Sequence, residues 1–342
     1  MQDTVLAQDT ATSVLEEYSN NSLLNQTLLI TGGTGSFGQK FTEIALKHNP
    51  RSIRIFSRGE LLQLEMQKKF GDNPKLRFFI GDVRDKDRLY RACDGVDIII
   101  HAAALKQVPL CEYNPFEAVQ TNILGSMNVV NAAIDCRVEK AIAISSDKAV
   151  EPLNLYGATK KVMECLWTQA NSYTGGRSTW FSCVRYGNVV ASRGSVIPVF
   201  LKQRENGSLT ITDDRMTRFW ITLEQGVNFV IDSLTRMQGG EIFIPKIPSM
   251  KIMDLAEAIS PSSKKVVTGI RSGEKMHEVL ITEHESRHAK EFYNYFIIEP
   301  EHSFWGTKFP SGESLPEGFR YSSDTNAQWL SKEELQKLLR DA

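Results

Sequence analysis

The stretch "LLITGGTGSFG" (residues 28–38) joins a run of apolar residues to three glycines spaced three apart, Gly32, Gly35 and Gly38. The apolar run is typical of a strand that is buried on both faces. The glycines allow a tight turn and a close approach of the backbone to a pyrophosphate, whose charge the start of the following helix would stabilise. Because the motif closes a strand and opens a helix, it predicts a dinucleotide-binding site rather than an ordinary tight connection.

The segments that follow this turn alternate regularly between strands and helices. Short apolar runs rich in Ile, Val and Phe predict strands, and longer mixed segments between them predict helices. This alternation predicts an α/β fold built on a Rossmann-type doubly wound parallel sheet. The expected strands cover 27–31, 52–57, 76–80, 96–101, 140–145 and 179–186, and the expected helices include 37–48, 115–135 and 156–172.

The alternation loosens after Asn188, where short strands, prolines and helices are mixed. We therefore expect a smaller C-terminal α/β lobe that binds the substrate. The expected divisions are an N-terminal arm (1–25), a dinucleotide-binding Rossmann domain (26–190) and a substrate-binding lobe with a C-terminal segment (191–342), parts of which could return to the Rossmann domain. The arm is polar and lies outside the pattern, so it carries no functional prediction.

The composition favours a protein with neither a nucleic-acid nor a membrane partner. The 342 residues are 41% hydrophobic, and their net charge of −1 provides no bulk field for nucleic acid or an anionic membrane. No apolar run approaches the roughly 20 residues of a membrane span. The first basic residue is Lys40, so the N-terminus lacks the positive region of a signal peptide. Five scattered cysteines without a CxxC pair favour reduced thiols, and we expect a cytoplasmic protein.

The end of the second predicted strand, "IFSRGE" (55–60), bears on which dinucleotide is bound. An acidic residue there would bind the ribose 2′-hydroxyl of NAD, whereas a nearby arginine would accept the 2′-phosphate of NADP. This chain has Ser57 and Arg58 and no acid at the tip, so we expect NADP; a solvated arginine on an exposed turn is the alternative. Further residues expected around the cofactor are Asp82 and Val83, beside the adenine, and the small residues of "HAAALK" (101–106).

The stretch "SSDKAVEPLNLYGATK" (145–160) carries the groups expected to do chemistry. Tyr156 and Lys160 are four residues apart on a predicted helix, so they share one face. A tyrosine must ionise to accept a hydroxyl proton, and a neighbouring ammonium and a positive nicotinamide would lower its pKa from the ordinary value near 10. Tyr156 could then act as a base while hydride leaves the same carbon. A core tyrosine and a surface lysine often share this spacing, but the position behind a serine after the fifth strand favours the catalytic interpretation.

These motifs together resemble those of the extended short-chain dehydrogenase/reductase superfamily over about residues 27–300. Within it, the ordered blocks are similar to those of the inverting UDP-N-acetylglucosamine 4,6-dehydratases, which begin pseudaminic acid and related deoxysugar pathways. Tyr156 and the short chain favour this group, because the longer, membrane-linked retaining dehydratases usually carry Met at that position. The blocks include "SRGELLQLEM", "SSDKAVEPLNLYGATK", "VRYGNVVASRGSVIPVF", "RMTRFWIT" and "GIRSGEKMHEVL".

The resemblance implies a reaction without net redox change. Tyr156 would deprotonate the sugar C4 hydroxyl while hydride leaves C4, and Ser146 would hydrogen bond to the C4 oxygen. Lys148 would then remove the acidified C5 proton while Asp147 protonates the departing C6 hydroxyl. Return of hydride to C6 and inversion at C5 would give UDP-2-acetamido-2,6-dideoxy-β-L-arabino-hex-4-ulose. These roles require a lowered pKa for Lys148 and a raised pKa for Asp147.

The resemblance also implies a set of binding residues and a homo-oligomer, for which a hexamer is one candidate. Ser272 stands where the family motif often has proline, which changes no ligand group. The expected cofactor residues are Gly32, Thr34, Gly35, Ser36, Phe37, Gly38, Ser57, Arg58, Asp82, Val83, Ala102, Ala103, Ala104, Lys106, Asn122, Tyr156 and Lys160. The expected residues for the substrate, UDP-N-acetylglucosamine, are Lys106, Asn114, Tyr186, Asn188, Arg218, Arg271 and Glu274, with a surface charge as the alternative for each of the last three.

A separate motif, "HESRH" (284–288), matches the H-E-x-x-H helix of zinc proteases. Its surroundings are strongly charged, as in a solvated helix, and no third ligand stands at a matching spacing. We therefore expect no metal site.

Two other functions remain open at the level of sequence. A UDP-sugar C4 epimerase would use Tyr156 and the cofactor but would leave Asp147 and Lys148 without a role in elimination. A non-catalytic NADP-binding sensor is the other, although a sensor has no need of the Tyr–Lys–Ser set.

Overall fold

The computed structural model describes residues 22–176, 178–190, 196–302, 304–306 and 309–340, and its centre is a ten-stranded sheet. From one edge the strand order is β3-β2-β1-β4-β5-β6-β10-β15-β14-β16. The first seven strands are parallel and the last three are antiparallel. Their bounds are β1 (Thr27–Thr31), β2 (Ser52–Ser57), β3 (Leu76–Ile80), β4 (Ile98–His101), β5 (Lys140–Ile144), β6 (Trp180–Val184), β10 (Ile242–Pro245), β14 (Ala289–Glu291), β15 (Tyr295–Ile298) and β16 (Glu313–Ser314).

The six predicted strands are all present and form the Rossmann order 3-2-1-4-5-6. Three have the predicted bounds, and the other three are one to three residues shorter. Of the predicted arm over 1–25, residues 1–21 lie outside the described residues. Among the helices in the described part of the chain, none has the length and apolar content to cross a membrane.

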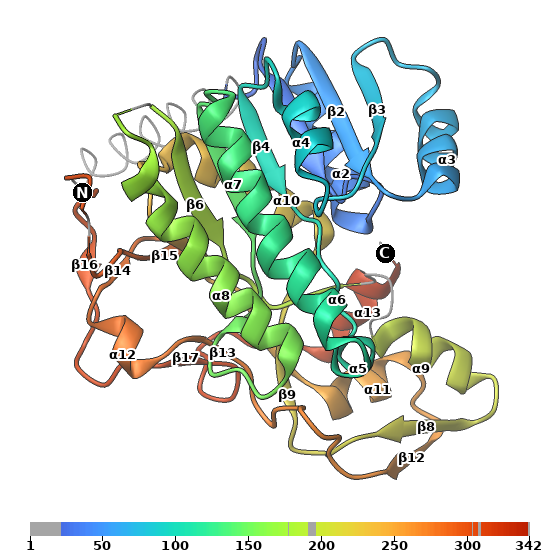
Figure 1. Ribbon diagram of the computed structural model, residues 1–342. Coiled ribbons are helices and arrows are strands. Elements are labelled where there is room, and N and C mark those ends of the chain that lie inside the picture. The colour runs from blue at the N-terminus through green and yellow to red at the C-terminus, as the bar shows by residue number, and fades with distance from the viewer. Residues whose placement is uncertain (1–21, 177, 191–195, 303, 307–308, 341–342) are drawn as a thin grey trace, which may run out of the picture.

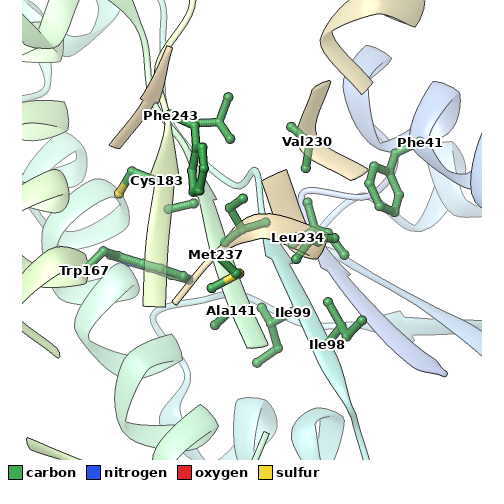
Figure 2. Close-up of a cluster of buried hydrophobic side chains, with 14 of the residues drawn as sticks. Phe41, Ile98, Ile99, Ala141, Trp167, Cys183, Val230, Leu234, Met237 and Phe243 are labelled. Carbon is green, nitrogen blue, oxygen red and sulfur yellow. The ribbon is translucent and has the colours of Figure 1, made fainter. Parts of the chain in front are cut away.

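Helices cover both faces of the sheet (Figure 1). On one face lie α4 (Lys86–Cys93), α7 (Gly125–Asp135) and α8 (Leu155–Ala170), and on the other α10 (Leu223–Arg236) packs beside α2 (Ser36–Lys47). Figure 2 shows the core between these layers, with Val230 and Leu234 of α10 and Phe41 of α2 among the strand side chains. This packing fixes the strand ends that carry the site.

The remaining helices of this half surround the strand ends. The segment predicted as one helix over 115–135 is α6 (Pro115–Val119), a π-helical turn η1 (Gln120–Leu124) and α7 in succession. Such a π-helical insertion is rare and often marks a functional position. The others are α3 (Glu60–Phe70), α5 (Val108–Tyr113) and the 3₁₀ turns η2 (Asp147–Ala149) and η3 (Asn171–Tyr173).

The C-terminal half is divided between the large sheet and a smaller lobe. Strands β10, β14, β15 and β16 join the sheet, whereas a second core forms around residues such as Phe200, Leu209, Trp220 and Leu255. The elements outside the large sheet are β7 (Asn188–Val189), β8 (Ser208–Ile211), β9 (Thr217–Ile221), β11 (Ser249–Lys251), β12 (Lys264–Val267), β13 (Val279–Ile281), β17 (Tyr321–Ser322), α9 (Val196–Arg204), α11 (Ile252–Ile259), α12 (Glu283–Ser286) and α13 (Lys332–Arg340).

Candidate active site

A cavity of about 680 Å³ opens at the carboxyl ends of the parallel strands, where open α/β sheets bind ligands. It runs from the glycine turn after β1, past the tip of β2, to the turn after β5. Most of the predicted site residues meet here. The cavity is lined by Gly32, Thr34, Gly35, Ser36, Phe37, Gly38, Ser57, Arg58, Asp82, Val83, Ala102, Ala103, Ala104, Lys106, Ser146, Asp147, Lys148, Tyr156, Lys160, Tyr186 and Asn188.

The glycine turn brings the backbone close to its neighbours. Gly32 has a φ of 68°, and a Cβ there would lie 2.9 Å from the backbone of Ala103. A Cβ on Gly38 would lie 2.4 Å from the carbonyl oxygen of Gly33. Side chains at these positions would therefore separate β1, the loop after β4 and the first turn of α2. Their absence lets the N-terminus of α2 face the cavity, where its backbone N–H groups can bind an anion.

Two buried hydroxyls that the sequence did not single out also lie on the cavity wall. Thr121 Oγ1 and Ser145 Oγ line the cavity, and neither has a hydrogen-bond partner among the described residues. Buried polar atoms normally have partners, so unpaired hydroxyls beside a cavity indicate a polar ligand. Together with the glycine turn, they show that the residues present fit a dinucleotide.

The tip of β2 holds a cation next to an anion. The Ser57 hydroxyl accepts a hydrogen bond from Gln63 Nε2 at 3.1 Å, which fixes it at the cavity edge. Arg58 Nη1 lies 3.7 Å from Asp82 Oδ2, and the Arg58 side chain is 54% exposed. Arg84 contacts the same carboxylate at 2.7 Å but does not line the cavity. Of these two arginines, Arg58 is therefore the one that reaches the cavity.

The turn after β5 holds the predicted acid and base in contact. Lys148 Nζ lies 3.2 and 3.1 Å from Asp147 Oδ1 and Oδ2. The Ser146 hydroxyl donates to Asp147 Oδ1 at 2.7 Å and accepts from the Lys148 backbone N–H at 3.2 Å. Because the Asp147 side chain is 2% exposed, its charge is compensated mainly by these two neighbours. The predicted base and acid thus form one hydrogen-bonded unit.

Helix α8 carries Tyr156 directly against this turn. Asn154 caps the helix by accepting a hydrogen bond from the backbone N–H of Gly157 at 2.9 Å. A Cβ on Gly157 would lie 2.1 Å from the carbonyl oxygen of Lys148, so only glycine permits this approach. The sequence interpretation missed Gly157, although a glycine inside a predicted helix was a signal for close packing.

The pKa values of the two tyrosine-motif residues differ from the expectation. Burial and Asp147 raise the pKa of Tyr156 to about 12, while the nearby Lys148 ammonium and Ser146 hydroxyl lower it. Burial lowers the pKa of Lys160 to about 8, and its Nζ donates to the carbonyl of Ile144 at 2.5 Å. In the protein without ligands, Lys148 is therefore the lysine that favours the phenolate form of Tyr156. Lys160 was expected to have this role.

The expected lowering of the Lys148 pKa is also corrected by the structure. Burial lowers this pKa, but the negative charges of Asp147 and Glu278 outweigh burial and raise it above its ordinary value. Glu278 Oε1 lies 2.9 Å from Lys148 Nζ, and its side chain is 1% exposed. The sequence interpretation missed Glu278, because it lies far along the chain in a segment quoted only for Arg271 and Glu274. Lys148 therefore rests as an ammonium between two carboxylates.

Asn122 lies outside the cavity lining, although it was expected at the cofactor. It is buried in η1, where its Oδ1 accepts from the backbone N–H of Leu105 and its Nδ2 donates to the carbonyl of the same residue. Nδ2 also donates to Thr159 Oγ1 at 2.9 Å. Asn122 thus ties the loop that bears Lys106 to helix α8 and positions the cavity wall.

Four of the residues expected to bind the substrate also lie outside the cavity lining: Asn114, Arg218, Arg271 and Glu274. Arg218 is buried, and its guanidinium donates to the backbone carbonyls of Thr217, Lys275 and Met276. Its Nη2 lies 3.6 Å from Glu274 Oε1, so the structure brings these two predicted residues together. Arg271 is exposed in the turn that leads to Glu274, and Asn114 is exposed at the junction of α5 and α6.

The H-E-x-x-H motif has a structural role in the described residues. Glu285 accepts hydrogen bonds from Arg185 and completes a capping box with Thr282 at the start of α12. No group of three His, Cys, Asp or Glu side chains in the described part of the chain could hold a metal ion. The motif's glutamate therefore pairs with an arginine, and the prediction that the protein binds no metal stays a prediction.

A Rossmann-order sheet with a glycine turn and a Tyr-x-x-x-Lys helix over one cavity defines the class of extended short-chain dehydrogenases/reductases. The chain belongs to the polysaccharide biosynthesis protein family, whose model matches residues 28–300.

Known proteins resemble this chain over nearly its whole length. The UDP-N-acetylglucosamine 4,6-dehydratase (inverting) of Campylobacter jejuni is 50% identical over 326 residues, which cover 91% of this chain and 96% of that protein. The UDP-glucose 4-epimerase of Rickettsia canadensis is 40% identical over 327 residues, which cover 92% and 96%. The crystal structure of Pen from Bacillus thuringiensis matches with a TM-score of 0.85 at 40% identity and covers 94% of this chain and 99% of that chain.

Proposed function

We propose that this protein is a UDP-N-acetylglucosamine 4,6-dehydratase that inverts C5. The reaction oxidises C4, eliminates water across C5 and C6, returns hydride to C6 and adds a proton from solvent to the opposite face of C5. One observation carries the proposal: the Asp147–Lys148 pair shares a cavity with Tyr156 and the glycine turn. The 50% identity to the Campylobacter jejuni dehydratase supports it.

The cavity would bind a nicotinamide dinucleotide along the glycine turn. When bound, this group supplies a reversible acceptor of hydride. The N-terminus of α2 would bind the pyrophosphate, and Thr121 and Ser145 would hydrogen bond to polar groups nearer the reacting end. We favour NADP over NAD because Arg58 lines the cavity at the ribose end and can accept a phosphate in a charge-assisted bond.

Tyr156 would take the proton of the C4 hydroxyl. Its raised pKa means that the phenol is protonated in the free protein at neutral pH. The positive charges that converge on the loaded site would stabilise the phenolate, and Ser146 is placed to hydrogen bond to the C4 oxygen. Lys160 is anchored at the carbonyl of Ile144, so it can contribute charge without competing for the substrate.

The Asp147–Lys148 pair can provide both an acid and a base from its resting form. One proton moves from Lys148 Nζ to Asp147 Oδ2 along the 3.1 Å contact, breaking an N–H bond and forming an O–H bond. The product is an amine and a carboxylic acid with unchanged total charge. The amine then removes the C5 proton, and the acid protonates the departing C6 hydroxyl. Both groups return to the ion pair seen in the structure.

An NMR experiment in deuterated water tests this proposal. The purified protein is incubated with UDP-N-acetylglucosamine, and the sugar signals are followed. We expect a 4-keto-6-deoxy sugar of L-arabino configuration with deuterium at C5. The similarity to a Rickettsia protein named UDP-glucose 4-epimerase makes epimerisation the second candidate, and recovery of only UDP-N-acetylgalactosamine would select it. Absence of any turnover with the dinucleotide bound would favour a sensor.

A further inference from the structure

Glu278 is a buried carboxylate that, like the predicted acid, contacts the proposed base. It immediately precedes β13, and its Oε1 lies 2.9 Å from Lys148 Nζ, while Asp147 contacts the same nitrogen at 3.1 Å. A carboxylate that is 1% exposed needs compensation by cations or hydrogen bonds. The position of this buried carboxylate, between the site and the C-terminal segment, therefore indicates a function.

Two further cations lie beside Glu278. Arg218 Nε is 3.7 Å from Oε1, and Lys275 Nζ is 3.9 Å from Oε2. Both cations are themselves held, because Arg218 donates to three backbone carbonyls and Lys275 donates to the carbonyl of Val150. Glu278 is thus a buried carboxylate flanked by three cations.

This arrangement distinguishes the two carboxylates that flank Lys148. A proton leaving Lys148 Nζ can move to Asp147 or to Glu278 by distance alone. Asp147 lines the cavity and receives a hydrogen bond from the Ser146 hydroxyl, whereas Glu278 lies outside the cavity lining, beside Arg218 and Lys275. Of the two carboxylates, Asp147 is therefore the one placed to pass a proton to a bound substrate.

We propose that Glu278 is a positioning residue that holds Lys148 against Asp147. This inference rests on the proposed dehydratase function. The ionisable groups that face Lys148 are Asp147 on its own turn, Tyr156 on α8, Arg218 on β9, and Lys275 and Glu278 in the segment before β13. In the charged network, Glu278 is the only one of these, apart from Asp147, that favours the ammonium.

The variant Glu278→Gln keeps the size of the side chain and removes its charge. The first measurement needs no turnover: the ammonium of Lys148 is titrated by NMR on lysine side chains, with its signal assigned by its loss in Lys148→Arg. We expect the midpoint to fall by about one pH unit or more in Glu278→Gln, since one of two contacting anions is lost. An unchanged midpoint in the folded variant would overturn the proposal, whatever the enzyme's activity.

The second measurement follows product formation against pH. In Glu278→Gln we expect kcat to fall about 10-fold or more and its basic limb to move to lower pH, with KM changed less than about 3-fold. Glu278→Asp, which keeps the charge, should restore the position of that limb and part of kcat. If kcat fell in both variants while the basic limb of its pH profile stayed at the wild-type position, the role of Glu278 would be structural and the proposal would be wrong. Failure of the wild-type protein to form product would reject the dehydratase function, while the titration would still decide the Glu278–Lys148 coupling.

Discussion

At the scale of single residues, hydrogen bonds within the protein, rather than contacts with solvent, hold the charged side chains of the site in place. Lys148 is held by two carboxylates, and the pKa of Lys148 is raised because of them. The motif predicted which groups are present but not their resting protonation, because protonation depends on neighbours that the motif does not contain.

The first prediction concerns Lys148 as the base. Lys148→Ala should lower product formation by about 10²–10⁴-fold, the usual contribution of a positioned acid or base. Dinucleotide affinity should change less than about 3-fold, because the glycine turn is untouched. Fluorescence titration and product NMR measure the two effects. Lys69→Ala, on the exposed face of α3, is the matched control and should leave both unchanged. Unimpaired turnover of Lys148→Ala would remove this residue from the mechanism.

The second prediction concerns Arg58 and the choice of dinucleotide. Arg58→Ala should weaken NADP binding by about 10-fold or more, the value of a charge-assisted hydrogen bond, and leave NAD binding nearly unchanged. Calorimetric titration with each dinucleotide measures this. Arg84→Ala is a matched control, since Arg84 contacts the same Asp82 but does not line the cavity. Equal losses for both dinucleotides, or an effect of Arg84→Ala as large as that of Arg58→Ala, would contradict the assignment.

At the scale of elements, close packing between backbone segments positions the site. Helix α8 approaches the carbonyl of Lys148 through Gly157, and the π-helical turn places Asn122 against the loop at Leu105. Neither contact depends on the residues that would react. Both set where those residues stand relative to one another.

The third prediction uses this close approach. Gly157→Ala would place a methyl group on the Lys148 carbonyl, so we expect a loss of about 1–3 kcal/mol of stability and about 100-fold in turnover as Tyr156 shifts. Urea unfolding and product formation measure these. Gly226→Ala in α10 is the matched control, because its nearest neighbour would be 3.8 Å away, and it should gain up to about 1 kcal/mol. A fully active Gly157→Ala variant would show that the approach is not required.

At the scale of the whole molecule, a buried ion cluster joins the C-terminal segment to the sheet. Arg185 at the end of β6 contacts Glu164 of α8 at 2.7 Å and Glu285 of α12 at 2.9 Å, and it also donates to the carbonyl of Leu280 in β13. Because β13 directly follows Glu278, this cluster anchors the segment that brings Glu278 to Lys148.

The fourth prediction follows from the ionisation of Glu285. Burial raises its pKa, but Arg185 outweighs burial and lowers the pKa from 4.5 to about 2. A lowered pKa in the folded state contributes stability above the unfolded value that is lost as pH falls through the folded value. We expect about 3 kcal/mol to be lost between about pH 5 and pH 2. Urea unfolding against pH measures it.

Glu285→Gln isolates this contribution from general acid unfolding. The variant should be less stable than the wild type at pH 7 and should show a weaker fall in unfolding free energy between about pH 5 and pH 3. Glu283→Gln, on the exposed side of the same short helix, should follow the wild-type curve. Parallel curves for Glu285→Gln and the wild type would show that Glu285 is not the group responsible.

Local sequence patterns were enough to predict the parallel sheet, the glycine turn and the Tyr156–Lys160 and Asp147–Lys148 pairs, because each depends on residues a few positions apart. The surroundings of these groups depend on how the whole chain folds. Only the folded chain brings Glu278 to Lys148, leaves Thr121 and Ser145 facing the cavity, and packs Gly157 on a carbonyl. These contacts join segments that are distant in sequence. The protonation, burial and close approach of the site residues depend on such neighbours, and a local sequence pattern does not specify them.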